Sequence, residues 1–558
     1  MKKPIGITAL LAGLLLSTAS AATRDWVGGN SEEGESLAWD VSTHWSNNTI
    51  PSTPDDAARF LNGTTVSVLV PVGSSATILS TQSNTTVTFD LSAPTLPDTP
   101  TLTLSSFLDV GVTTTPASDT PSLVTVKGSG GVLHANALRV GVTSGRGGNQ
   151  LTFTDGVVVT STLSNTSSVI GRDSFDNLLQ IEQGAKVTVG NLSVGSLTGV
   201  GNNRLVITGA NSEFTVGAIG SLRGLRVGVK EGTSYADAAQ DNYVHVSDGG
   251  KLVVTTLITG SSNNVNIGGQ TRAHDNYILV EGANSIFELG KGESTGSTTV
   301  QIGDDDGLDH GGNYLEIRDG GLLRSGTGHT GAITIYGHDS SDPAAQASNR
   351  LTVGDDGTVS VGGAINVTGG LLQLSSQGSL TSASVTVGAG GRFEAAGDDF
   401  RTTGSGTTIQ NLGTLAVQEE TLSLRTGVTL ANGATLELHL LDGETAAGLE
   451  LLSGGSLSIG STTRLRLVAD DAAALQSGAS WQLFTGTNLD QITGSFNLDL
   501  AELPTLDGGL SWDFSAFDEN GGWRVTVIPE PGSVALLGVG FALLALRVFR
   551  RKPPTPVS

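Results

Sequence analysis

The chain has no cysteine, and its 558 residues include only 16 prolines, a single methionine and 5% aromatic residues. The absence of cysteine excludes disulfides, thiol catalysis and thiolate metal sites, so we expect backbone hydrogen bonds and packing to provide the stability. Charged residues make up only 15% of the chain, and the net charge is −24. Such an acidic chain repels phosphates, which argues against nucleic acids and anionic membrane surfaces as partners.

Glycine is abundant instead, with 78 residues, and Val, Leu and Ile recur in alternation with polar residues. Alternation of this kind places the apolar side chains on one side of a strand. Because helix-favouring residues are scarce, the pattern predicts a mainly β protein. The length exceeds that of one ordinary compact core, which predicts several domains or one elongated repeat.

Seven segments repeat one pattern: an asparagine, alternating aliphatic residues, a glycine-containing turn and a second alternating stretch, as in "NRLVITGANSEFTVG". The segments begin at Asn149, Asn177, Asn203, Asn242, Asn276, Asn313 and Asn349. These asparagines lie 26 to 39 residues apart, so the unit is constant while its loops vary in length. An asparagine that recurs at a strand edge suits either a turn or a ladder of stacked amides.

A single unit cannot bury its own apolar face, whereas a stack of units can. Leu205 and Ile207, for example, lie two residues apart and face the same side of a strand. We therefore expect a β-solenoid, specifically a right-handed parallel β-helix, over residues 129–400. A string of antiparallel β-sandwich domains is the alternative, but sandwiches favour a buried tryptophan and the repeats contain none.

The regions on either side of the repeats differ from them in composition. Residues 22–128 begin with Trp26, Trp39 and Trp45, which predict a β cap over the open end of the solenoid or, alternatively, an aromatic platform that stacks sugar rings. Residues 401–527 contain the other three tryptophans, and we expect a C-terminal β domain that closes the far end.

Both termini carry features of an exported protein. Residues 1–21 form a predicted signal peptide, with two lysines, an apolar run and small residues at Ala19 and Ala21 that suit cleavage. Residues 528–558 combine Pro-Glu-Pro with a short apolar segment, for which we expect a single short transmembrane helix. The positive-inside rule places the basic flank of this helix in the cytoplasm. That flank consists of Arg547, Arg550, Arg551 and Lys552.

The order of these parts resembles the PEP-CTERM sorting signal of Gram-negative bacteria, with Pro529, Glu530 and Pro531 as the motif. The resemblance implies recognition by an exosortase, cleavage near the motif, and passage from an inner-membrane intermediate to the cell surface or the extracellular matrix. A permanent membrane anchor, with Pro-Glu-Pro incidental, is the alternative. The repeats separately resemble autotransporter-associated β-strand repeats.

The densest group of carboxylates lies in "GDDDGLDH" and contains Asp304, Asp305, Asp306 and Asp309. Clustered carboxylates are suited to Ca²⁺, so this group is a candidate calcium site, a solvated turn, or part of a polysaccharide lyase. Its spacing fits neither an EF-hand loop nor a nonapeptide calcium repeat. The eight histidines show no zinc-binding spacing. We therefore expect no catalytic residues and no cofactor besides the candidate Ca²⁺.

The sequence thus predicts an exported, non-catalytic β-solenoid that serves as a structural element or adhesin at the cell surface or in the extracellular matrix. Its expected partners are the secretion machinery, an exosortase-type processing enzyme at the C-terminus, and polysaccharide or other matrix components. The alternative is a carbohydrate-binding or polysaccharide-degrading, lyase-like β-helix protein. An enzyme would present converging carboxylates and a base in a cleft, whereas a structural rod would present a smooth polar surface.

Overall fold

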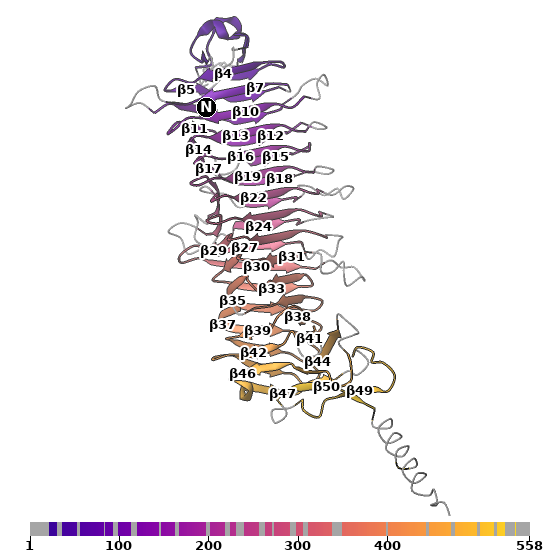
Figure 1. Cartoon of the computed structure of the whole chain (residues 1–558). Coiled ribbons are helices and arrows are strands. Elements are labelled where there is room, and N and C mark those ends of the chain that lie inside the picture. Colours follow the sequence, from indigo (N-terminus) through magenta and orange to yellow (C-terminus); the bar gives the residue numbers. More distant parts are fainter. Residues whose placement is uncertain are drawn as a thin grey trace, which may run out of the picture.

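The computed structural model shows an elongated rod of stacked β-coils (Figure 1). The first coils lie at one end of the rod and the last coils, with a small antiparallel sheet, at the other. The structure describes residues 22–30, 36–52, 56–82, 84–92, 99–112, 120–143, 147–161, 167–196, 201–217, 224–229, 239–255, 263–269, 273–290, 297–304, 311–337, 349–397, 400–441, 446–469, 475–498, 503–517, 522–530 and 542.

Each regular coil contributes one strand to each of three faces, and every strand pairs in parallel with its counterparts in the neighbouring coils, as β13 does with β10 and β16. The first face comprises β2 (Leu37–Ala38), β4 (Thr65–Leu69), β7 (Thr86–Asp90), β10 (Leu123–Lys127), β13 (Gln150–Thr154), β16 (Leu178–Ile181), β19 (Arg204–Thr208), β22 (Tyr243–Ser247), β25 (Tyr277–Glu281), β28 (Tyr314–Arg318), β31 (Arg350–Val353), β34 (Leu371–Leu374), β36 (Arg392–Ala395), β38 (Thr414–Val417), β41 (Thr435–Leu440), β44 (Arg464–Ala469) and β48 (Asn497–Leu498).

The other two faces belong to one continuous parallel sheet. The second face comprises β5 (Ser74–Ala76), β8 (Thr101–Leu104), β11 (Val132–His134), β14 (Val158–Thr160), β17 (Lys186–Val189), β20 (Glu213–Val216), β23 (Lys251–Val254), β26 (Ile286–Leu289), β29 (Leu322–Ser325) and β32 (Thr358–Ser360). The third face comprises β1 (Thr23–Asp25), β3 (Ala57–Phe60), β6 (Ile78–Thr81), β9 (Phe107–Val110), β12 (Ala137–Val140), β15 (Ser168–Ile170), β18 (Leu192–Val194), β21 (Leu225–Val227), β24 (Asn263–Ile267), β27 (Ser297–Ile302), β30 (Thr330–Tyr336), β33 (Ala364–Thr368), β40 (Gly427–Leu430), β43 (Ser456–Ile459) and β47 (Ile492–Gly494).

Two long strands, β35 (Ser379–Val387) and β37 (Phe400–Ile409), join the second and third faces, since β35 pairs with both β32 and β33. A three-stranded parallel sheet of β39 (Leu422–Leu424), β42 (Leu449–Leu451) and β46 (Phe484–Gly486) belongs to the last coils. The remaining elements are the antiparallel strands β45 (Ser480–Gln482), β49 (Leu510–Asp513) and β50 (Arg524–Pro529), and the short 3-10 helices η1 (Ser42–His44), η2 (Ser46–Asn48) and η4 (Leu489–Gln491).

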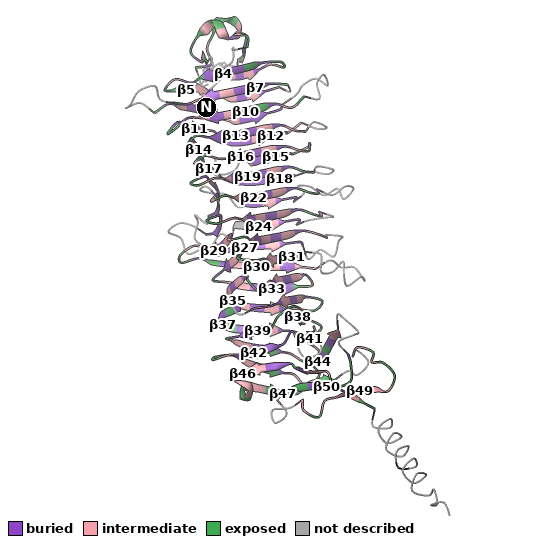
Figure 2. Cartoon of the chain, in the orientation of Figure 1, coloured by how far each residue is buried: buried purple, intermediate pink, exposed green. Residues whose placement is uncertain are grey.

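The core is one continuous apolar column inside the three faces (Figure 2). Strands alternate buried and partly exposed residues, and Leu205 and Ile207 of β19 are fully buried as the sequence pattern predicts. Burial of this alternating set is the main favourable term in folding, because apolar surface leaves water. The prediction of a mainly β chain built on parallel sheets is confirmed. The right-handed winding stays a prediction.

Parallel pairing extends well beyond residues 129–400. It begins with β1 and β3, and it ends with β44 and β48. Trp26, Trp39 and Trp45 are buried at the N-terminal end of the core, at 3%, 1% and 0% exposure. The platform interpretation is therefore wrong, because these rings pack against one another and against the core rather than facing solvent.

The repeated asparagines form a ladder of stacked amides along the corner between the third and first faces. Each lies directly before a first-face strand, and all seven are buried. From Asn149 to Asn349, each side-chain amide donates to the carbonyl oxygen of the next asparagine side chain, at 2.8 to 3.1 Å. The same oxygen also accepts from the preceding asparagine's backbone N–H, as Asn276 Oδ1 does from Asn242. Of the two sequence interpretations, the amide ladder is the one that forms.

Each of these asparagines lies against a glycine that ends a third-face strand. At Gly228 the backbone has φ +64°, and an added Cβ would come within 2.1 Å of the Asn276 side chain. Glycine is therefore needed at this position for two reasons: it tolerates the left-handed conformation, and it leaves room for the asparagine amide. The turns from the first to the second face also use left-handed residues, such as Asp248 and Asp319 at φ 52° and 53°.

The far end of the rod is closed by the antiparallel sheet and an aromatic cluster. β50 lies between β45 and β49. Trp481 and Trp523 are buried there, and Trp523 contacts Phe484 edge to face at 5.4 Å. Within the described part of the chain, we find no helix with the length and apolar character that a membrane crossing requires. The predicted signal peptide lies outside the described residues, and so does the predicted transmembrane helix apart from Ala542.

Candidate functional sites on the tail and the first face

The start of the predicted sorting motif belongs to the folded terminal sheet. Pro529 is the last residue of β50 and lies opposite Leu510 of β49, and the backbone N–H of Glu530 donates to Gly509 O at 2.8 Å. Both Pro529 and Glu530 are exposed, while Val527 just before them is buried. Because proline has no N–H to pair, it is tolerated at this strand end. The first residue of the motif is therefore part of the sheet, and an enzyme that binds the motif must contact the chain at the edge of this sheet.

Most other residues that the sequence singled out lie outside the described part of the chain. For the sorting and signal segments these are Pro531, Arg547, Arg550, Arg551, Lys552, Ala19 and Ala21. Of the candidate calcium ligands, Asp304 lies two residues after the end of the third-face strand β27 and is partly buried, whereas Asp305, Asp306 and Asp309 are not described. Among the described residues, no group of three or more histidines and acidic residues could hold a metal ion. The calcium site stays a prediction.

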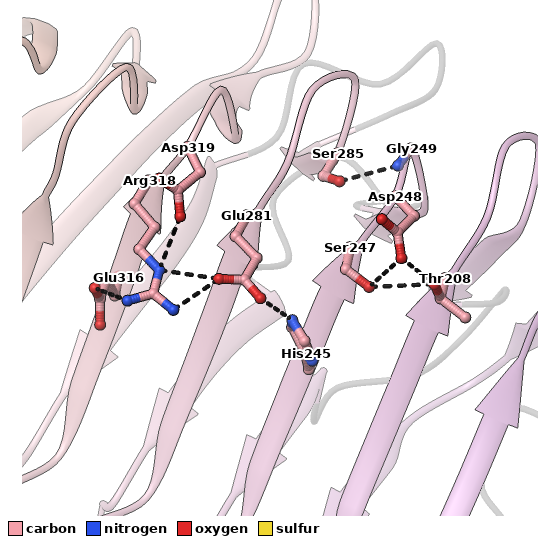
Figure 3. Close-up of polar contacts among 10 residues, drawn as sticks. All are labelled: Thr208, His245, Ser247, Asp248, Gly249, Glu281, Ser285, Glu316, Arg318 and Asp319. Atoms are coloured by element: carbon pink, nitrogen blue, oxygen red, sulfur yellow. Dashed lines mark hydrogen bonds and ion pairs between the residues drawn. The ribbon is translucent and has the colours of Figure 1, made fainter.

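The outward side of the first face carries a network of charged side chains that crosses several coils (Figure 3). Glu281 of β25 accepts from His245 Nε2 of β22 at 2.8 Å and from Arg318 Nη2 of β28 at 2.7 Å. Burial alone would raise the pKa of Glu281, but the hydrogen bonds from Arg318 and His245 outweigh it and hold the pKa below its usual value. Glu281 therefore stays ionised, as a partner in ion pairs rather than a proton donor.

Beside this network, three tyrosines stack along the rod axis. Tyr243, Tyr277 and Tyr314 lie in register, with ring centroids 4.8 and 4.7 Å apart and nearly parallel planes. The guanidinium of Arg350 lies 4.3 Å from the centroid of Tyr314 on the next strand. Tyr277 and Tyr314 thus have both faces covered, so a sugar ring cannot stack on them. The sequence signal for this stack was the dipeptide Asn-Tyr in three successive repeats.

A second charged cluster lies farther along the same face. Glu437 of β41 accepts from Arg392 Nη2 at 2.6 Å and from Arg466 Nη1 at 3.1 Å, and His439 Nε2 lies 3.3 Å away. Burial would raise the pKa of Glu437, but the hydrogen bonds from His439 and Arg392 and the nearby positive charges lower it to about 2. Sequence reasoning missed this cluster, because its members come from coils 45 and 29 residues apart.

Comparisons with known proteins bear on the tail and on the body separately. Residues 527–552 match the model of the PEP-CTERM protein-sorting motif. No curated protein matches the chain. Among solved structures, a hyper-glycosylated TibA55-350 fragment, glycosylated by TibC, is similar at 15% identity and a TM-score of 0.30, covering 75% of this chain and 99% of that one. The match at residues 527–552 indicates an exported protein that carries a C-terminal sorting signal.

Proposed function

We propose that this chain is an exported, non-catalytic rod that an exosortase-type enzyme processes at its C-terminus and that acts at the cell surface or in the extracellular matrix as a structural element or adhesin. The observation that carries the proposal is the sorting motif at residues 527–552, which begins on the last strand of the terminal sheet. The rod itself then has no part in sorting. It is the cargo that the tail delivers.

The state of the described carboxylates supports a role without catalysis. A general acid needs a raised pKa and access to substrate. Burial raises the pKa of the Asp109 carboxyl, but Asp109 is only 4% exposed and pairs with Arg139, whose guanidinium lies 3.7 Å from the Phe107 ring centroid. Glu281 and Glu437 sit in ion pairs that lower their pKa values. These are features of structural salt bridges on the first and third faces of the rod.

Intact-mass analysis of the mature protein from its native host, with and without the sorting enzyme, tests the proposal. We expect a mass without residues 1–21 in both strains, and loss of a C-terminal piece near Pro529 only where the sorting enzyme is present. The variant Glu530→Ala should retain the tail, whereas Glu420→Ala, an exposed glutamate far from the motif, should be processed normally. Retention of the tail in both strains would instead indicate a permanent anchor.

A further inference from the structure

The outward side of the first face has a hollow between β31 and β38, with a volume of about 200 Å³. Side chains from four successive coils line it, among them Thr352, Gln373, Ser375, Glu394 and Gln418. Glu437 does not line the hollow, but Arg392 connects the two, because it donates to Glu437 and to Glu394 of the lining. Nothing in the sorting function uses this feature.

The hollow arises from the side-chain sizes at one position of the first-face strands. When the strand register is continued one or two residues past the last paired residues, this position is occupied in successive coils by Arg318, Gly354, Ser375, Ala396 and Gln418. Three small residues therefore follow a long one and precede another long one. Because the flanking strands pair continuously in parallel, the backbone cannot collapse into the space that the small side chains leave.

The hydrogen-bonding groups of the hollow are held in place before any ligand enters. Glu394 accepts from Arg392 Nε at 2.6 Å and from Gln418 Nε2 at 3.0 Å, and Gln373 Nε2 lies 3.5 Å away. Two further lining groups lack partners: Thr352 Oγ1 and Ser375 Oγ are buried and form no hydrogen bond in the structure. Both oxygens are closed off from solvent, so the polar groups that a ligand can reach are the side chains of Gln373, Glu394 and Gln418.

The chemistry of the lining narrows the class of ligand. Anions are disfavoured because Glu394 and Glu419 both line the hollow. A metal ion is disfavoured because Glu394 Oε1 already accepts from Arg392 and Gln418, and Glu394 Oε2 accepts from Gln373. Apolar ligands would leave the amides and hydroxyls unpaired. An organic cation is disfavoured because Arg392 already pairs with Glu394 at 2.6 Å. What remains is a neutral group whose own hydroxyls both donate and accept.

The volume limits the size of that group. Sites for drug-sized ligands span about 300–1,000 Å³, so this hollow has room for about one ring. We propose that it binds a single neutral sugar residue of a polysaccharide, with Glu394, Gln373 and Gln418 hydrogen-bonded to the sugar hydroxyls. The proposal rests on the adhesin role for its biological meaning, because it names the chemical class that the adhesin would hold.

Binding of the full chain to immobilised neutral oligosaccharides tests this assignment, using glucans, galactans, mannans and N-acetylglucosamine polymers as probes. We expect at least one class to bind, and Ser375→Leu, which fills the hollow, to weaken binding at least tenfold. Thr125→Leu is the matched control, since Thr125 is a partly exposed outward residue of the first-face strand β10. It should bind within about twofold of the unchanged chain.

A second variant distinguishes a loss of binding from a loss of folding. Gln418→Ala removes one wall from a partly exposed position without touching the core, and we expect it to weaken binding several-fold. Absence of binding to all four probe classes, or binding that Ser375→Leu and Gln418→Ala both leave unchanged, would overturn the assignment. Tail processing is measured separately by mass, so a failure of sugar binding and a failure of sorting give different results.

Discussion

The coils between Asn149 and Asn349, here called the ladder coils, and those between Arg350 and Leu440, the tight coils, share one three-faced architecture but close one corner differently. First-face strands in the tight coils follow one another at 21 or 22 residues, as the pairs Arg350–Leu371 and Arg392–Thr414 show. In the ladder coils the same distance varies from 26 to 39 residues. The rod therefore contains a region of fixed repeat length and a region of variable repeat length.

Part of the difference lies between the second and third faces, where the connection ranges from two residues between β17 and β18 to eight between β20 and β21. The rest follows from which group closes the corner between the third and first faces. In the tight coils a four-residue turn does so, with Gly391 N donating to Gly388 O at 3.0 Å and Ala434 N donating to Ala431 O at 3.0 Å. A turn of this kind fixes the number of residues. In the ladder coils the buried asparagine side chain replaces the turn and bonds to the coils on both sides. The chain can then leave the corner as a loop of any length and return to the same register.

The largest effect that we expect comes from removing one amide in the middle of the ladder. Asn276 accepts from Asn242 Nδ2 at 3.0 Å and donates to Ala239 O, His274 O and Asn313 Oδ1 at 2.9 to 3.1 Å. Asn276→Leu leaves these buried groups unpaired, at about 1–3 kcal/mol each. We expect a loss of about 3–5 kcal/mol, measured as faster hydrogen–deuterium exchange in β22, β25 and β28.

The matched control for this variant lies in the tight coils. Asn411 is exposed in the turn after β37, so Asn411→Leu should change the free energy of unfolding by less than about 0.5 kcal/mol. Exchange is the appropriate readout, because long repeat arrays need not unfold in a single step and each coil depends mainly on its neighbours. Equal effects of the two variants would show that the amide ladder does not hold the corner.

Sequence reasoning found the ladder coils because they repeat one residue at one corner. The alternation around Leu205 and Ile207 predicted the strands, and the recurring asparagine predicted an amide ladder as one of two options. Outside this region the same corner is occupied by Thr85 and Ser122 on one side and by Gly391 and Ala434 on the other. The repeated asparagine is absent there although the coils continue. The first and last strands of the parallel sheets therefore could not be predicted from the sequence.

The hollow and the charged clusters were invisible in the sequence for a different reason. Each depends on contacts between residues of different coils, such as Arg392 with Glu437, 45 residues away. Which residues of different coils lie side by side can be predicted only when the strand register is known. The register cannot be predicted from the sequence, because the connections between strands vary in length. The sorting motif, in contrast, is a local pattern of consecutive residues, and its presence at residues 527–552 is confirmed.

The second expected effect is that the stability of the tight coils and that of the ladder coils depend differently on pH. The pKa of Glu437 in the tight coils lies at about 2 against an ordinary 4.5, so its ion pairs stabilise the fold above pH 4.5 and are lost as the pH falls toward 2. The difference corresponds to about 3 kcal/mol. In the ladder coils burial, with the neighbouring tyrosines Tyr314 and Tyr243, raises the pKa of Tyr277 to about 12, so stability there is lost as the pH rises from 10 toward 12.

Urea unfolding followed by circular dichroism at pH 7, 3 and 11 measures both losses. Glu437→Gln should reduce the difference between pH 7 and pH 3. Tyr277→Phe should reduce the difference between pH 7 and pH 11, and part of that difference will remain because the pKa of Tyr314 is also raised. Some acid dependence will remain in Glu437→Gln, because the pKa values of Glu281 and Glu288 in the ladder coils are also lowered. Identical pH profiles for both variants and the unchanged chain would contradict the electrostatic difference between the regions.

The smallest expected effect is the one that most directly tests variable spacing. Deleting the seven residues 340–346 shortens the separation between Asn313 and Asn349 from 36 to 29 residues, within the range that the ladder already contains. The free energy of loop closure depends only weakly on length, so we expect a change below about 1 kcal/mol in thermal or urea unfolding. Deleting Gly390 alone, at φ +72° inside the turn that ends at Gly391, should cost more despite removing one residue, because either the turn is distorted or β36 moves one residue out of register with β34. If the seven-residue deletion were the more harmful of the two, the asparagine would not be what restores the register.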